Sequence, residues 1–209
     1  MREHPITPVT EPLQYRAIGL VRGTYCPEDI ARFTRGILID EKGLEIESVV
    51  LGRLMTLMQR HISLEKPHLW VVYPRCRDEK KLHLQLAGVW EPSTLEIEEQ
   101  REGSSQKSKS KPEDKLFEGD DYFSIRGELI FTKSDTQDLI IKIRQKPRKN
   151  LNKPLPFKIF LKGDIPINYL NHFLSINARR IGDTFFVENY ESIALIRGKE
   201  KKNTIDTRK

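Results

Sequence analysis

Apolar and polar positions alternate with a period of two in several stretches of the chain, most clearly in residues 139–146 and 157–162. Because successive side chains of a β-strand point to opposite faces, each stretch is predicted to be a strand with one apolar face. The opposite faces gather basic residues and one aromatic residue, namely Lys142, Arg144, Lys146, Lys158, Phe160 and Lys162. Paired as a hairpin, the two strands would present a basic surface.

The same patterning predicts two similar series of elements. In the first half, strands are expected at residues 15–25, 36–40, 44–51, 68–73 and 82–90, with an amphipathic helix at 54–62. In the second half, strands are expected at residues 122–132, 139–146, 157–162, 184–188 and 192–197, with a short helix at 166–177. Each half therefore has the order strand, strand, strand, helix, strand, strand, and the fold class is mainly β with short helices.

Composition divides the chain into modules and connections. Residues 1–13 hold three prolines and are expected to be a flexible arm. Residues 93–119 are rich in Glu, Ser and Lys without an apolar period, as is typical of a disordered linker. The predicted organisation is an arm at 1–13, a module at 14–92, a linker at 93–119, a basic module at 120–198 and a disordered basic tail at 199–209.

Charge and cysteine content narrow the class of protein. The formal net charge is +6, and most of the basic excess lies in residues 120–209. The two cysteines, Cys26 and Cys76, form no CxxC pair, which favours a reducing compartment over a disulfide scaffold or zinc finger. Arg75 and Arg77 flank Cys76 and would favour its thiolate form. No apolar run is long enough for a membrane span or a signal peptide, so a cytoplasmic, soluble protein without membrane association is expected.

Five strands with a helix after the third, and a glycine inside the first strand, resemble the oligonucleotide-binding (OB) fold. Val21-Arg22-Gly23 and Ile125-Arg126-Gly127 are the matching strand segments of the two halves. The resemblance implies two tandem five-stranded barrels. The segments GLVRGTY, LGRLMTLMQ and HLWVVYP also resemble uncharacterised cyanobacterial proteins, a resemblance that implies no function. The competing fold is a single mixed α+β domain with the linker as an insertion.

The OB resemblance implies a ligand surface on the second and third strands, flanked by the loops that follow the first and fourth strands. In the basic module those loops would be residues 134–137 and 189–190. The candidate nucleic-acid-binding residues are Lys142, Arg144, Lys146, Arg148, Lys158, Phe160, Lys162 and Tyr190. Cations would neutralise phosphates, and the rings would stack on bases. The alternatives are a solvated hairpin that keeps an exposed face soluble, and a Tyr190 that belongs to the core.

No motif for a phosphate-binding loop, a catalytic triad or a metalloprotease is present, so neither a catalytic site, a metal site nor a cofactor is expected. The leading hypothesis is a non-enzymatic protein that binds single-stranded nucleic acid, RNA or DNA, through the second module. The alternative is an assembly factor that uses OB-like barrels as a scaffold for protein partners. In either case the near-neutral first module could dock a protein partner or a second copy of the chain.

Overall fold

The computed structural model describes residues 4–29, 32–77, 81–91, 116–145 and 155–196. The elements of the first module are β1 (Arg16–Asp29), β2 (Arg32–Asp40), β3 (Glu45–Val50), α1 (Gly52–His61), β4 (His68–Arg77) and β5 (Lys81–Val89). Those of the second are β6 (Tyr122–Lys133), β7 (Asp138–Ile143), β8 (Phe157–Lys162), the 3₁₀ turn η1 (Ile167–Tyr169), β9 (His172–Ile181) and β10 (Thr184–Leu195).

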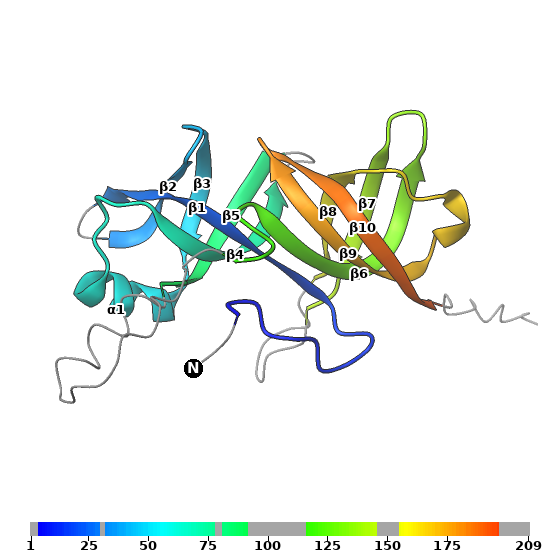
Figure 1. Ribbon diagram of the computed structural model, residues 1–209, viewed down its shortest axis with the longest axis horizontal. Helices are drawn as coiled ribbons and strands as arrows, with labels where there is room; N and C mark the ends of the chain where they lie inside the picture. Colours follow the sequence, from blue (N-terminus) through cyan, green and yellow to red (C-terminus); the bar gives the residue numbers. More distant parts are fainter. Residues whose placement is uncertain (1–3, 30–31, 78–80, 92–115, 146–154, 197–209) are drawn as a thin grey trace, which may run out of the picture.

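The described strands close into two barrels of five strands each (Figure 1). In the first module β1 pairs with both β2 and β4, and a parallel pairing of β3 with β5 completes the ring. In the second module β6 pairs with both β7 and β9, and a parallel pairing of β8 with β10 completes the ring. The two tandem OB-like barrels predicted from the sequence are confirmed.

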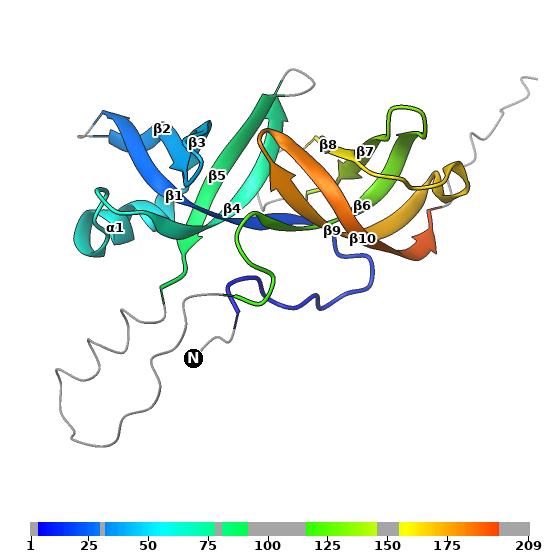
Figure 2. The ribbon, with the colours of Figure 1, turned by 45° about the horizontal axis from the view of Figure 1, so that its top comes forward.

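The two barrels share a pair of strands. The beginning of β1 runs antiparallel to β6, with Arg16 opposite Arg126 and Gly19 opposite Phe123, so the strands of both modules form one ten-stranded sheet (Figure 2). Gly19 is required at this junction, because a Cβ at that position would lie 2.2 Å from Cδ1 of the Phe123 ring. The sequence pattern predicted the modules but gave no sign of this pairing.

The inward positions of the strands form an apolar core in each barrel. In the first barrel Trp70 is fully buried, and its Nε1 donates a hydrogen bond of 2.8 Å to the Gly23 carbonyl oxygen. In the second barrel the rings of Phe123 and Phe185 meet edge to face with centroids 4.6 Å apart. Burial alternates along β7, where Leu139, Ile141 and Ile143 face inward. The strand period that predicted this face is confirmed.

The helix predicted at residues 166–177 is wrong. Only the single turn η1 forms, and it ends at Tyr169. Asn171, with a φ of 64°, follows it directly before β9 begins. Leu174, Ile176 and Ala178 are buried at every second position, as expected for a strand with one face in the core. The neighbouring apolar residues also fit the spacing of a helix. Tertiary burial on the barrel interior therefore decided between two periods that the local sequence leaves open.

The two strands predicted at residues 184–188 and 192–197 are a single strand, β10, with irregularities between Val187 and Asn189 and between Ser192 and Ala194. The loop between the fourth and fifth strands is therefore the turn at Gly182 and Asp183, and the loop predicted at residues 189–190 does not exist. Asn189, which suggested a turn, is instead an exposed position of this long strand.

The N-terminal segment lies along the sheet. Ile6 is 7% exposed and packs in a small apolar cluster with Ile18, Leu20 and Leu69. The Arg126 guanidinium also donates a hydrogen bond of 2.6 Å to the Pro12 carbonyl oxygen. Residues 4–13, expected to be a flexible arm, are therefore packed against the first strands of both barrels.

The expected linker lies outside the described residues from 92 to 115, and the expected tail lies wholly outside them.

Candidate nucleic-acid interface

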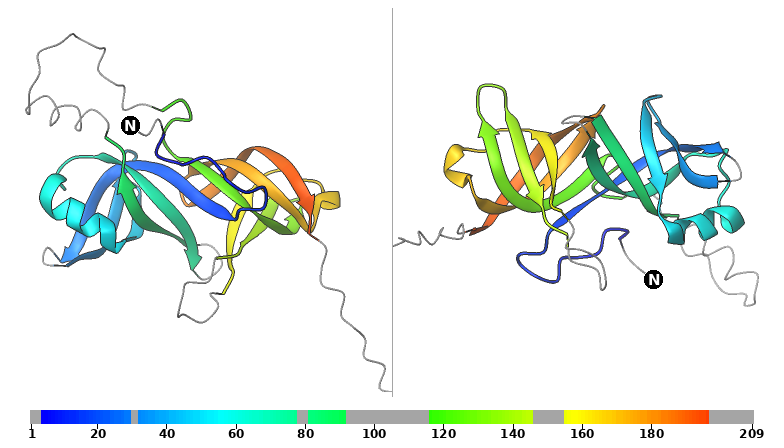
Figure 3. Two further views of the ribbon diagram at one scale, coloured as in Figure 1. Left: turned by 90° about the horizontal axis from the view of Figure 1, so that it is seen from below. Right: turned by 180° about the vertical axis from the view of Figure 1, so that it is seen from behind.

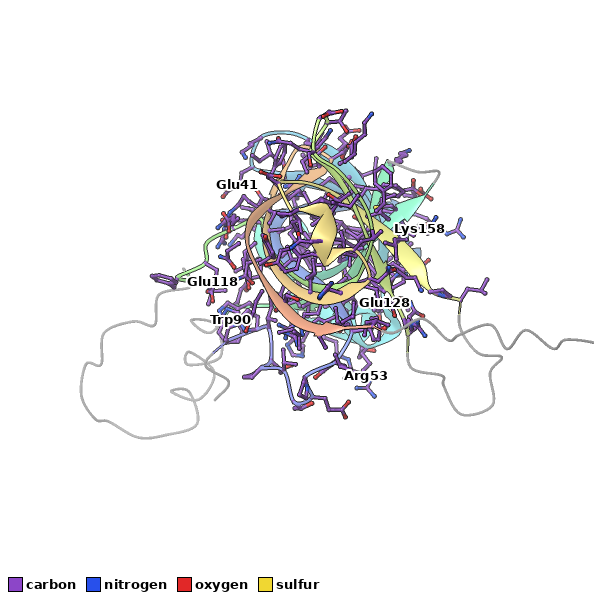
Figure 4. All side chains as sticks on the ribbon, turned by 90° about the vertical axis from the view of Figure 1, so that its right-hand side faces the viewer. Glu41, Arg53, Trp90, Glu118, Glu128 and Lys158 are labelled. Atoms are coloured by element: carbon purple, nitrogen blue, oxygen red, sulfur yellow. The ribbon has the colours of Figure 1, made fainter. Side chains whose placement is uncertain are left out.

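A row of charged side chains crosses the outer face of the second barrel. Glu128 on β6 is opposite Lys142 on β7, and Lys142 is opposite Lys158 on β8. The Lys158 side chain is exposed. Viewed along the long axis of the molecule, Glu128 and Lys158 lie on the same side of the barrel, and Glu118 and Glu41 lie on the other (Figure 4). We call Lys142, Arg144 and Lys158 the basic row.

Glu128 holds two members of the basic row. Its carboxylate is 2.8 Å from Lys142 Nζ and 2.7 Å from Arg144 Nε, and its side chain is only 6% exposed. The Tyr15 hydroxyl donates a third contact to the same carboxylate. Burial raises the pKa of Glu128, but the hydrogen bonds from Lys142 and Tyr15 and the two nearby cations outweigh it, so the pKa is lowered. The acid therefore stays ionised and fixes the directions of both cations.

The positive charge of the basic row exceeds the negative charge of Glu128. The exposed fractions of the Lys142 and Arg144 side chains are 29% and 54%, so both retain surface toward solvent. Among the described residues no carboxylate lies within ion-pair distance of Lys158. Three cations against one carboxylate leave a positive surface, and such a surface attracts phosphates.

The other predicted residues differ in their surroundings. Lys162 is opposite Asp138, and its Nζ lies 2.8 Å from that carboxylate, which neutralises much of its charge. Phe160 lies opposite Ile140 on the outer face and is half-buried. The thiol of Cys76, from the first module, accepts a hydrogen bond from the Phe160 backbone N–H. Phe160 therefore lies beside the first barrel and presents only part of its ring.

Tyr190 does not join the basic row. It lies within β10 opposite Ile176, and its ring meets the ring of Tyr169 with centroids 5.6 Å apart. Because β8 and β10 are parallel and aligned at Leu161 and Phe185, Tyr190 lies beyond the end of β8 that is farther from Lys158. Tyr190 is therefore partly buried against the core at this end of the barrel, away from the basic row. Lys146 and Arg148 lie outside the described residues.

Two arginines after the predicted helix, Arg179 and Arg180, have structural partners. The Arg180 guanidinium is buried between Asp40 of the first module, at 2.8 Å, and Asp121 of the second, at 2.5 Å. Arg179 Nε lies 2.8 Å from Glu188. Neither residue belongs to the basic row, and Arg180 instead joins the two barrels.

Sequence reasoning missed one cation near the basic row. The Arg75 guanidinium, on β4 of the first module, lies over the Phe157 ring at 4.0 Å from its centroid. Arg75 was considered only as a neighbour of Cys76, whose pKa it was expected to lower. Burial of Cys76 between the modules instead raises the pKa of the thiol. The Arg-Cys-Arg sequence signals local charge, but only the packing of β4 against β8 brings Arg75 to the start of β8.

Two closed five-stranded barrels, one with a basic surface on its second and third strands, define a tandem OB-fold protein. Residues 17–97 match the model of the N-terminal OB-fold domain of the PatR RNA-binding protein. Residues 125–194 match the model of a C-terminal cyanobacterial OB-fold-like RNA-binding domain. Because the two models together match more than half of the chain, the chain belongs to the family of tandem OB-fold proteins that they describe. No curated protein matches it.

The described part of the chain contains no group of His, Cys, Asp and Glu side chains that could hold a metal ion. No helix among those residues is long and apolar enough to cross a membrane.

Proposed function

We propose that the chain binds single-stranded RNA, without catalysing a reaction, through the outer face of β7 and β8. The observation that carries the proposal is the basic row on the second and third strands of the second barrel, the face on which OB folds commonly hold their ligand. The RNA-binding descriptions of both matching families support RNA over DNA as the ligand.

Electrostatics and shape determine what such a surface can bind. Lys158 and the outer surfaces of Lys142 and Arg144 can pair with consecutive phosphates of an extended strand, and the exposed edge of Phe160 can contact a base. A single RNA strand with unstacked bases fits the open face of a β-sheet. In an RNA duplex the bases are stacked inside the double helix and cannot contact the sheet in this way. Recognition of this kind depends weakly on sequence, because every base has a face that can stack.

The experiment is fluorescence anisotropy of labelled oligoribonucleotides with the full chain, over a series of salt concentrations. Lys158→Glu should weaken binding about tenfold and flatten the dependence of log K on log salt by about 0.7 per lost phosphate contact. The matched control is Lys66→Glu. Lys66 is an exposed lysine just before the start of β4, and Arg75 lies near the opposite end of that strand. A duplex RNA and a DNA strand of the same sequence complete the comparison.

Three outcomes contradict the proposal. The first is that the wild-type protein fails to bind single-stranded RNA at low salt. The second is that Lys158→Glu and Lys66→Glu weaken binding equally, which would place the contact elsewhere or reduce it to net charge. The third is equal binding of RNA and DNA of one sequence, which would remove the preference for RNA.

A further inference from the structure

The first part of β8 borders the first module. β10 pairs with β8 only at Leu161 and Lys162, so it leaves the edge at residues 157–160 uncovered. The end of β4 lies at this edge, where Cys76 accepts the hydrogen bond from the Phe160 N–H and Arg75 lies over Phe157. Seen from below, the end of β4 lies beside the start of β8 (Figure 3). We call this contact the seam.

Arg75 is suited to contact a ligand at the seam. Its guanidinium stacks on Phe157 at 4.0 Å, a geometry that orients the cation while leaving N–H groups at its edge. One of them, Nη1, donates to the Pro74 carbonyl oxygen at 2.9 Å. Among the residues that the structure describes, no carboxylate lies within ion-pair distance of Arg75. A guanidinium fixed in this way is a ready partner for a phosphate or for a stacked base.

The fold brings two kinds of ligand-binding element together at the seam. The β4–β5 hairpin is the fourth-to-fifth strand connection of the first barrel, and β7–β8 are the second and third strands of the second barrel. In OB folds each of these elements commonly contacts the ligand of its own barrel. Here they are adjacent. Lys158 points to the outer face of β8, and the Phe157 ring that carries Arg75 lies on the opposite face at the start of the same strand.

We infer that one RNA strand crosses the seam, from the basic row of the second barrel onto the end of β4 in the first, and that Arg75 is the contact that joins the two surfaces. This inference rests on the proposed function and adds a composite site to it. The first module then contributes directly to RNA affinity, although its net charge is close to neutral. Its contribution grows with the length of the RNA, because a short oligonucleotide can occupy the basic row without extending onto β4.

The test uses the full chain with labelled oligouridines from about 4 to about 20 nucleotides, which span the site sizes of one OB fold and more. The variants are Arg75→Ala and Arg75→Lys, with Arg53→Ala as the control, because Arg53 is an exposed arginine on α1, away from Lys158 (Figure 4). Arg75→Ala should bind the longest RNA about tenfold more weakly than wild type does, and the shortest RNA with a smaller loss. Arg75→Lys should recover part of the loss by restoring the charge without the planar stack.

The outcomes separate this inference from the proposed function. If Arg75→Ala equals wild type at every length while Lys158→Glu still weakens binding, the composite site is wrong and the proposed function stands. If wild type binds no RNA, the proposed function itself fails. Photo-crosslinking of 4-thiouridine RNA to the wild-type protein is independent of any effect of Arg75→Ala on folding. Crosslinks to the β4 segment at residues 68–77 support the inference, and crosslinks confined to the second barrel overturn it.

Discussion

The carboxylate of Asp40, in the first barrel, lies 2.8 Å from the guanidinium of Arg180, in the second, and both side chains are almost fully buried. Burial alone raises the pKa of Asp40, but the hydrogen bond and charge of Arg180, with two backbone N–H groups, outweigh it and lower the pKa. The buried charge of Arg180 is therefore compensated by one carboxylate from each barrel, Asp40 and Asp121.

Asp40→Ala should therefore destabilise the whole chain. Removing one member of a buried pair costs about 3 to 5 kcal/mol, and the lower end is expected because Asp121 also contacts Arg180. Urea unfolding measures the change. The double variant Asp40→Ala/Arg180→Ala should cost less than the sum of the two single variants, and additive effects would show that the pair is not coupled.

Stability should fall in acid more steeply than exposed carboxylates alone would cause. Asp40 and Glu128 have pKa values below their ordinary 3.8 and 4.5. Groups of this kind contribute stability that is complete above those values and is lost as the pH falls through the lower folded values. Urea midpoints measured from neutral to acid pH should drop, and Glu128→Gln should flatten the curve. Glu65→Gln, at an exposed loop position, is the control and should leave the curve unchanged.

Gly19→Ala should disrupt the junction of β1 with β6. Its new Cβ would lie 2.2 Å from the Phe123 ring, and that ring is held by its contact with Phe185. Overpacking of this kind costs about 1 to 3 kcal/mol, and the upper end is expected here. Gly52→Ala is the control, because a Cβ there meets nothing within 4 Å and lies at the start of α1. Equal unfolding temperatures for the two variants would contradict the close packing.

The N-terminal segment should contribute to stability although it contains no strand. Ile6→Ala removes a side chain that is 7% exposed in the cluster with Ile18, Leu20 and Leu69, and should cost about 2 kcal/mol. Leu13→Ala, in the same segment at 46% exposure, should change stability by less than about 0.5 kcal/mol. Limited proteolysis gives a second measurement, because loss of the Ile6 contact should make residues 4–13 easier to cleave.

The barrels could be predicted from sequence because their strands follow a local rule. Residues 139–146 and 157–162 alternate apolar with basic positions, and in the structure Ile141 and Ile159 face the core while Lys142 and Lys158 face outward. The error at residues 166–177 arose where one set of apolar residues satisfies two periods. There, only the position of the residues within the closed barrel selects the strand.

The arrangement of the site could not be predicted in the same way. The contact of Glu128 with Lys142 and Arg144 depends on the register between β6 and β7, which includes an irregularity between Leu129 and Phe131. The contact of Arg75 with Phe157 joins residues of different barrels, and no local pattern encodes it. A single sequence reveals which residues are basic, but the partners of those residues depend on long-range pairing.

The pairing of β1 with β6 should also hold the two modules together without a covalent connection between them. A cut in the chain between residues 91 and 116 would leave two fragments that still share a strand pair and the Asp40–Arg180 contact. The fragments should elute together in size-exclusion chromatography. The two modules would then behave like the subunits of a heterodimer. Each module could be exchanged with that of a relative whose residues at the β1–β6 junction match.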